Sequence, residues 1–266
     1  MSTADDLEEH STIFSNTSAA KELIYKSASI FERRRRILRE ARSLISERGY
    51  ENFNVRELAR RAKVAQRTLY NAFGSRENIV INAIYQYQSD FTEHVHFDSS
   101  PLTLLGRIER TVKVHSRNLQ IRPYTSAVMA IYNSPSSDLS IRQAIIRLSN
   151  NGIKPFAEHL AAKQQLARGV TPASYSLVLT RFSYATLSAW CLGEIPDGDM
   201  VESMAESLLT TTEASTKGVT KREASDWLQE VRERSPRWKE LKLRVEVPPV
   251  RRRGAGAGSK AAQGGG

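Results

Sequence analysis

The stretch NVRELARRAKVAQRTLYNAFGSREN, from Asn54 to Asn78, has the pattern of two short helices joined by a three-residue turn and followed by the start of a third helix. Asn54 is a favourable N-cap, and apolar side chains follow it at the spacing of one helix face. Lys63 and Val64 interrupt that apolar stripe. A second stripe begins with Leu69 and Phe73, which are four residues apart and therefore lie on the same side of a helix. The sequence predicts a helix-turn-helix.

The exposed face of the second short helix carries hydrogen-bond donors and no carboxylate. Its members are Gln66, Arg67, Thr68, Tyr70 and Asn71. Such a helix suits the major groove of DNA, where arginine pairs with guanine and glutamine or asparagine pairs with adenine. We expect Tyr70, Arg56, Arg76 and the backbone amides near Asn54 and Ser75 to meet phosphates, because helix starts present free N–H groups to anions.

Positive charge is concentrated around the same stretch. Between Arg33 and Arg76 there are thirteen Lys or Arg residues and four Glu residues, so this segment carries +9 of the net charge of +10. A local polycation is typical of a surface that binds nucleic acid, and it predicts an affinity that falls steeply with salt. The run Arg33, Arg34, Arg35 and Arg36 is expected to meet the phosphate backbone or the minor groove.

Residues 33–79 resemble the DNA-binding region of the TetR/AcrR family of one-component bacterial transcriptional regulators. In that family the first helix ends at a glycine followed by an aromatic residue, as at Gly49 and Tyr50. The pattern T-L-Y-x-x-F followed by a basic residue and Glu is matched by Thr68, Leu69, Tyr70, Phe73, Arg76 and Glu77. Two positions depart from the family pattern. Lys63 replaces the frequent turn glycine, and Ala65 replaces the usual Ser or Thr cap, each at a cost of roughly 1 kcal/mol.

The rest of the chain predicts an all-α fold with two domains. We expect a partly disordered extension over 1–31, the DNA-binding domain over 32–78, a helical ligand-binding and dimerisation domain over 79–247 and a flexible Gly/Ala-rich tail over 248–266. After the first helix at 32–48, the expected helices are 76–94, 123–132, 138–168 with a kink at Pro155, 172–192 ended by Gly193 and 199–215, followed by a charged segment over 221–243. A further helix between 76–94 and 123–132 is expected to be capped by Ser100, with Pro101 at its first position and Leu105 on its buried stripe.

The helices over 172–192 and 199–215 are the expected dimer contact. In the family, two such helices pack against their copies as a four-helix bundle. The first carries more apolar surface than one face needs, so a second subunit is the simplest cover, and a two-fold dimer matches a palindromic DNA site. The expected contact residues are Val178, Leu179, Phe182, Val201, Met204 and Leu208. The alternative is that this surface packs on residues 221–243 of the same chain.

A ligand pocket is expected among the helices of the second domain. His115 lies on an apolar stripe between Val112 and Leu119, where a hydrogen-bonded core histidine is the commoner case. The other candidates, which are equally consistent with plain core, are Tyr124, Met129, Tyr132, Tyr184 and Trp190. An aromatic lining with few charges favours an apolar or aromatic small molecule.

Other function classes find little support. The single cysteine, Cys191, excludes an internal disulfide, and the sequence has no membrane-length apolar run and no signal peptide, so we expect a cytoplasmic protein. The motifs of hydrolases, phosphate-binding loops and zinc proteases are missing, so no enzyme, cofactor or metal is expected. The sequence predicts a homodimeric repressor released from its palindromic operator on double-stranded DNA by a small-molecule effector. The alternatives are an activator with the same head, or a helical ligand-binding or adaptor protein that no longer binds DNA.

Overall fold

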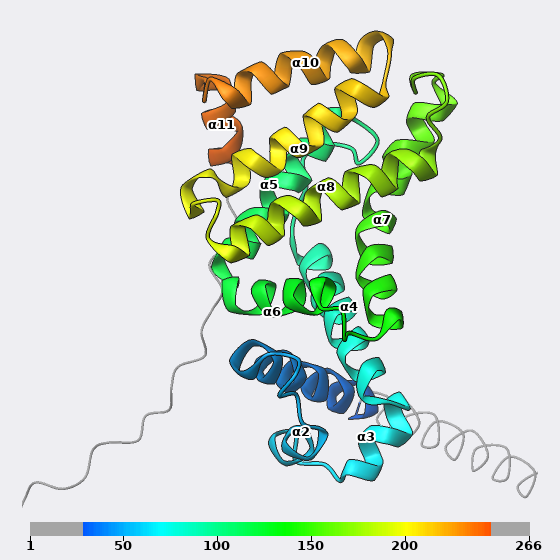
Figure 1. The fold of residues 1–266 in the computed structure, drawn as a ribbon, viewed down its shortest axis with the longest axis vertical. Coiled ribbons are helices and arrows are strands. Elements are labelled where there is room, and N and C mark those ends of the chain that lie inside the picture. The colour runs from blue at the N-terminus through cyan, green and yellow to red at the C-terminus, as the bar shows by residue number, and fades with distance from the viewer. Residues whose placement is uncertain (1–28, 246–266) are drawn as a thin grey trace, which may run out of the picture.

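The computed structural model describes residues 29–245, and within that range the chain is folded into helices (Figure 1). In chain order they are a first helix at 29–48, α2 (Val55–Arg61), α3 (Gln66–Phe73), α4 (Arg76–His94), α5 (Leu104–Gln120), α6 (Arg122–Asn133), α7 (Leu139–Ala162), α8 (Pro172–Leu192), a 3-10 turn at Asp197–Asp199, α9 (Met200–Ser215), α10 (Gly218–Arg232) and α11 (Pro236–Arg244). The only strand-like pairing in this range is a single antiparallel bridge between Leu166 and Thr216. The all-α fold class is confirmed. The predictions for residues 1–28 of the N-terminal extension and for the whole tail over 248–266 lie outside the described residues.

The first helix, α2 and α3 form a small three-helix head at the lower end of the molecule (Figure 1). Its core is made by apolar side chains that the sequence pattern had placed inward, and Leu44, Leu58 and Leu69 are fully buried in it. Burying one such side chain stabilises the head by about 1.5–3 kcal/mol. The head is therefore held by the same periodic leucines that identify its helices.

Helix α4 joins the head to the larger helical body and runs between them (Figure 1). It begins after Ser75, whose hydroxyl accepts a hydrogen bond from the Asn78 amide, and it ends at His94, as the sequence predicts. Its buried residues include Ile79 and Ile84, and the helix also packs against α7. Motion in the body can reach the head through this helix.

The start of α5 differs from the expectation. Thr103, not Ser100, caps the helix by accepting from the Gly106 amide, so Pro101 lies in the turn before the helix. A Cβ atom on Gly106 would lie 1.9 Å from the Ser100 carbonyl oxygen, so the preceding turn folds tightly over the first turn of the helix. As a result Leu104 is buried, while Leu105, which was expected to face inward, is 37% exposed.

Two later boundaries also differ from the expectation. Helix α7 ends at Ala162 and not at Arg168, because Gln164 has a positive φ of 55° and the chain then pairs with the end of α9, where Ala167 N donates to Ser215 O at 2.9 Å. The expected single segment over 221–243 is two helices, α10 and α11. They are separated at Arg234, whose φ is 46°, and Ser235 caps the second.

Helix α8 has the bounds that the sequence predicts, with a capping box at Thr171 and Gly193 in the left-handed conformation at its end. It packs on α6, α7 and α9, while α9 is covered by α5, α8 and α10. Helix α9 is consequently almost wholly inside the body. None of the described helices combines the length and the apolar character that crossing a bilayer requires.

Candidate DNA-binding head and ligand cavity

Helix α3 presents a polar face to solvent. Leu69 and Phe73 anchor its other side in the core of the head. Gln66, Arg67 and Asn71 are exposed and Thr68 is half-buried, while Tyr70 is 46% exposed. The exposed members match the size and donor chemistry of a major-groove reading surface. Their contacts with bases remain a prediction.

The two departures in the turn have the expected structural form. Lys63 adopts a φ of 52°, the left-handed conformation that glycine takes without strain. Ala65 occupies the N-cap position of α3 and provides no side-chain cap. The start of this helix is therefore held by its packed side chains rather than by a cap.

The arginine run at the start of the first helix is used largely inside the protein. Arg34 donates to Ala72 O at 3.2 Å and to Asn82 Oδ1 at 2.8 Å, and its guanidinium lies 4.4 Å from the Phe73 ring centroid. Arg35 pairs with Asp90 at 3.3 Å. Arg36 donates to Ala62 O at 3.3 Å. These three side chains tie the first helix to α2, α3 and α4, although Arg36 is exposed, as is Arg33.

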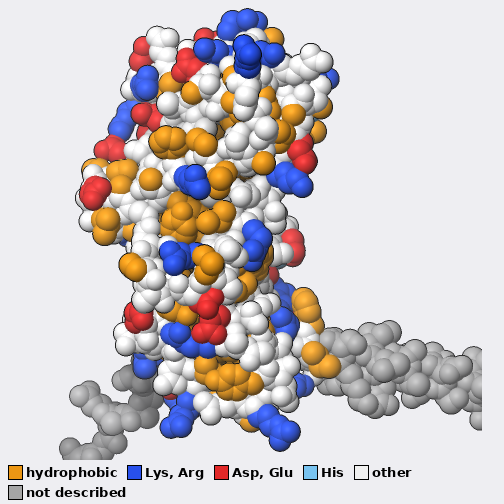
Figure 2. Space-filling model, turned by 45° about the vertical axis from the view of Figure 1, so that its right-hand side comes forward, with side chains coloured by type: hydrophobic (Ala, Val, Ile, Leu, Met, Phe, Trp, Pro, Cys, Tyr) orange, Lys and Arg blue, Asp and Glu red, His pale blue; other side chains and the backbone are white. Residues whose placement is uncertain are grey.

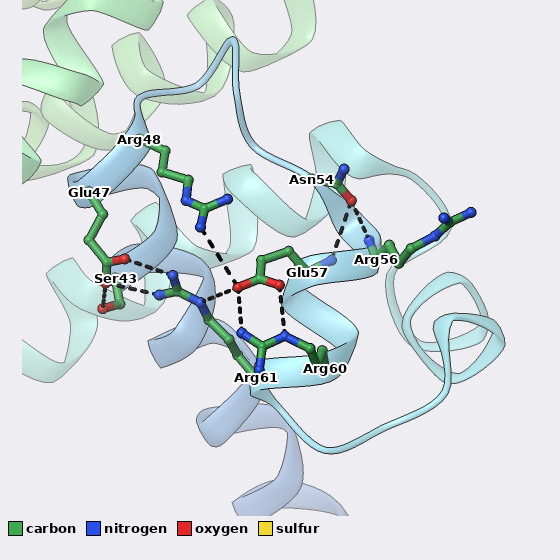
Figure 3. A network of polar contacts seen from close by, with 8 residues as sticks. All are labelled: Ser43, Glu47, Arg48, Asn54, Arg56, Glu57, Arg60 and Arg61. Carbon is green, nitrogen blue, oxygen red and sulfur yellow. Dashed lines mark hydrogen bonds and ion pairs between the residues drawn. The ribbon is translucent and has the colours of Figure 1, made fainter.

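Arg76 is engaged in a way that sequence did not reveal. Its guanidinium donates to the carbonyl oxygens of Tyr50 and Phe53 and lies 4.1 Å from the Tyr50 ring centroid. It thereby fixes the loop before α2 to the start of α4, and little of it is left for a phosphate. Asn54 caps α2, as expected, by accepting from the Arg56 and Glu57 amides. The Arg56 side chain points away from the head (Figure 3).

Two acidic residues of the head, Glu47 and Glu57, pair with neighbouring arginines (Figure 3). Glu57 accepts from Arg60 at 2.8 Å and from Arg61 at 3.0 Å, and these hydrogen bonds lower the pKa of Glu57 to about 2. Arg61 also reaches Glu47 at 2.8 Å. The network leaves Arg56, Lys63 and Arg67 as exposed cations beside α2 and α3. Lys and Arg side chains accordingly project from the head end of the molecule (Figure 2).

The body contains a partly open cavity of about 310 Å³ lined by α4, α5, α6, α7 and α8, with Leu208 of α9 at its wall. Four of the six expected pocket residues line it, namely His115, Tyr124, Met129 and Tyr184. Tyr132 and Trp190 do not. Tyr132 packs edge-on against Tyr184, with the ring centroids 4.9 Å apart. Trp190 is fully buried elsewhere and donates its indole N–H to Asp197 at 2.8 Å.

Two arginines line the cavity that sequence reasoning did not single out. Arg107 and Arg110 come from α5, as do Thr111, His115 and Asn118. The spacing of Arg107, Thr111, His115 and Asn118 places them along one side of a helix. That polar stripe was visible in the sequence, but only the packed helices show that it faces a cavity rather than solvent.

His115 is uncharged in this setting. Burial and the nearby charge of Arg107 lower the pKa of His115 to about 3. Its Nδ1 lies 3.1 Å from the Asn118 side-chain amide nitrogen. Because that amide nitrogen is a donor, Nδ1 is the acceptor, and the imidazole hydrogen is placed on Nε2 by this assignment.

Comparison with known proteins agrees with this architecture. Residues 37–83 match the family model for bacterial regulatory proteins of the tetR family. The matched residues run from the first helix into α4 and therefore span the three-helix head. No curated protein sequence matches it.

Solved structures share the TetR-family fold at low sequence identity. A protein from Rhodococcus sp. assigned to the TetR family of transcriptional regulators matches with a TM-score of 0.53 and 19% identity, over 68% of this chain and 98% of that one. SmeT, the repressor of the Stenotrophomonas maltophilia multidrug efflux pump SmeDEF, matches with a TM-score of 0.52 and 15% identity, over 70% and 92%. FadR of Bacillus subtilis, solved in complex with stearoyl-CoA, matches with a TM-score of 0.50 and 17% identity, over 66% and 96%.

The expected dimer residues fall into two groups. Val178 and Phe182 of α8 are 38% and 56% exposed, and Leu192 at the end of the same helix is 76% exposed. The other four expected residues, Leu179, Val201, Met204 and Leu208, are buried within the subunit. Leu179 and Leu208 line the cavity instead. Val201, Met204 and Leu208 belong to α9, which packs against α5, α8 and α10 of its own chain, and Leu179 of α8 faces the cavity. All four are therefore covered within the subunit.

Proposed function

We propose that this protein is a homodimeric transcriptional repressor that binds a palindromic operator and leaves it when a small molecule occupies the cavity. The observation that carries the proposal is the reading face of α3, which is exposed, rich in donors and free of carboxylates, on a helix locked from behind by Leu69 and Phe73. A face of this kind favours base contacts in a major groove. SmeT is a repressor and FadR binds stearoyl-CoA, and both share the fold.

A contact between the head and the cavity wall supports the regulatory part of the proposal. Arg42 of the first helix lies 5.4 Å from the Tyr87 ring centroid. Tyr87 and Tyr124 pack edge to face at 5.4 Å, and both line the cavity. A ligand that shifts either ring therefore acts directly on the head. A ligand changes DNA affinity only through different affinities for the two head arrangements.

The exposed face of α8 is the proposed dimer contact. Val178 and Phe182 are four residues apart and lie on one side of the helix. Exposed apolar side chains in such a row favour burial against a second copy. Phe182→Glu should convert the dimer to a monomer in light scattering, while the exposed Leu105→Glu on α5 should leave the mass unchanged.

DNA binding is tested by selecting a site for the full-length protein from random duplexes and footprinting the upstream region of its own gene. Arg67→Ala should weaken the selected site by roughly 10–100-fold, because one good base contact contributes about 1–3 kcal/mol. Arg147→Ala, on the exposed side of α7, is the matched control. In vitro transcription with the footprinted promoter then distinguishes a repressor from an activator. Failure to select any specific duplex at moderate salt would sink the proposal.

A further inference from the structure

The polar groups that face the cavity include basic side chains but no acidic ones. They include Arg107, Arg110, His115 and the Tyr124 hydroxyl, and none of the residues lining the cavity is an Asp or Glu. The opposing walls from α6, α7 and α8 are largely apolar, with Met129, Ile145, Ile153, Leu179 and Leu187 among them. The cavity is therefore amphipathic, with its positive side on α5.

Arg107 has unused binding capacity. Its NH1 donates to the Gly152 carbonyl of α7 at 2.7 Å, its Nε is buried without a hydrogen-bond partner, and its NH2 also has no partner among the described residues. Among the described residues, no carboxylate lies within ion-pair distance of it. Burial lowers the pKa of Arg107 to about 10, so the guanidinium keeps its charge at neutral pH. A half-buried cation without a counter-charge carries a desolvation cost, and a bound anion would offset that cost.

The nearest acid on α5 cannot supply that counter-charge. Glu109 accepts the backbone amides of Asp98 and Ser99 at 2.7 and 2.8 Å and also the Lys113 ammonium at 3.0 Å. Arg110 has different surroundings, because its NH1 donates to the Ser99 and Gly106 carbonyls, both at 2.9 Å, and its guanidinium covers the Phe97 ring at 4.4 Å. The negative charge of Glu109 also acts on Arg110 and opposes the lowering of its pKa by burial. Arg107 has no acidic neighbour of this kind, so it is the cation of the cavity without a counter-charge.

Neutral donors accompany that cation. The Tyr124 hydroxyl has no hydrogen-bond partner. The Nε2 hydrogen of His115 is likewise free of the contact with Asn118, which uses Nδ1. One free guanidinium with neutral donors suits a single negative charge, whereas a phosphate dianion would bring more charge than the cavity compensates.

From this arrangement we infer that the effector is a monoanionic carboxylate joined to an apolar or aromatic body, with its carboxylate on Arg107. The inference rests on the proposed function in taking the cavity as the effector site. It adds a carboxylate to the apolar or aromatic small molecule that the sequence favours, because the sequence did not place Arg107 in the cavity.

The test uses matched acid and alcohol probes on the full-length protein. Calorimetry at neutral pH would compare decanoic acid with 1-decanol, and 2-naphthoic acid with 2-naphthalenemethanol. The variants are Arg107→Met, which removes the charge, Arg107→Lys, which keeps it without the planar fork, and Arg147→Met on the exposed side of α7 as the control. Circular dichroism melts report whether each variant is folded.

The expected result is a preference for at least one acid over its alcohol. Arg107→Met should reduce acid affinity by roughly 10–100-fold, since a hydrogen bond to a charged group is lost, and leave alcohol affinity nearly unchanged. Arg107→Lys should give an intermediate loss. The control should behave as the wild type.

Two outcomes would overturn the inference. One is equal binding of acids and alcohols with a ratio that Arg107→Met does not change, and the other is no binding of either acid by a folded protein that still binds its selected duplex. Failure of the proposed function would give a different result. A protein that prefers the acids but binds no specific duplex would support the inference about the cavity and contradict the proposed regulatory function.

Discussion

Arginines of the head have acidic partners, whereas Arg107 of the cavity has none. In the head, Arg60 and Arg61 are neutralised by Glu57 and Glu47 in a network at the surface. In the body, Arg107 lines a cavity without any such partner. The head thus uses paired charges to hold its shape and leaves a few cations free for a polyanion. The cavity keeps one charge unpaired at the expense of stability, which is understandable if a ligand completes the pair.

The largest expected effect comes from a substitution that destabilises the head and leaves the body folded. Leu69→Ala should lower the free energy of unfolding of the head by about 2–5 kcal/mol, because Leu69 is fully buried at the back of α3. Hydrogen exchange would locate the loss of protection in the head. The control is Leu105→Ala on the surface of α5, which should cost about 0.5 kcal/mol or less. Equal loss of protection in both regions would contradict the separation.

Mild acid should destabilise the body before the head. The pKa of His115 is near 3 in the fold and 6.5 without it, so its contribution is present above pH 6.5 and is lost as the pH falls toward 3. Between pH 7 and pH 5 the loss is at most about 2 kcal/mol. Urea unfolding at both pH values should show this slope in the wild type and not in His115→Gln. Identical slopes would refute it.

Removing an arginine should change the free energy of unfolding in opposite directions in the cavity and in the head. Arg107→Met should raise the free energy of unfolding by about 1 kcal/mol or less, since it removes a half-buried charge that has no counter-charge. Arg61→Met should lower it, because Glu47 and Glu57 lose a shared partner. Thermal and urea unfolding without ligand measure both. A destabilising Arg107→Met would mean that its bond to the Gly152 carbonyl matters more than its charge.

The smallest expected effect is the loss of stability of the head when Glu57 becomes protonated in acid. Hydrogen bonds from Arg60 and Arg61 lower the pKa of Glu57 from 4.5 to about 2. Its contribution is therefore present above pH 4.5 and is lost as the pH falls toward 2. Glu57→Gln should melt below the wild type at pH 5 and low salt, and the difference should shrink by pH 3. Added salt should also shrink it, because the network is exposed.

Local signals allowed much of the fold to be predicted. Thr171-Pro172 and Gly193 correctly predicted the start and the end of α8. The spacing of the leucines correctly predicted the core of the head. The start of α5 was wrong because Ser100-Pro101 has the same local pattern as a cap and a first helical residue. What displaced the helix was a tertiary contact, the close approach of Gly106 to the Ser100 carbonyl.

The site residues divide in the same way. The exposed face of α3 followed from the positions of Leu69 and Phe73, which are local. The engagement of Arg76 with Tyr50, the burial of Met204 and the facing of Arg107 into the cavity all depend on which helix packs beside them. Periodicity identifies a face of a helix, but it does not say whether another helix, a second subunit or a ligand covers that face.

Gly106 offers a way to sort relatives by ligand chemistry. Any side chain at this position would collide with the preceding turn, so the glycine sets where α5 begins and how the helix is rotated about its axis. That rotation points the next residue, Arg107, at the cavity. In an alignment of homologues, Gly-Arg retained as a pair would mark proteins that share an anion-accepting pocket. A bulkier residue in place of the glycine would mark a helix that starts differently, and with it a different choice of effector.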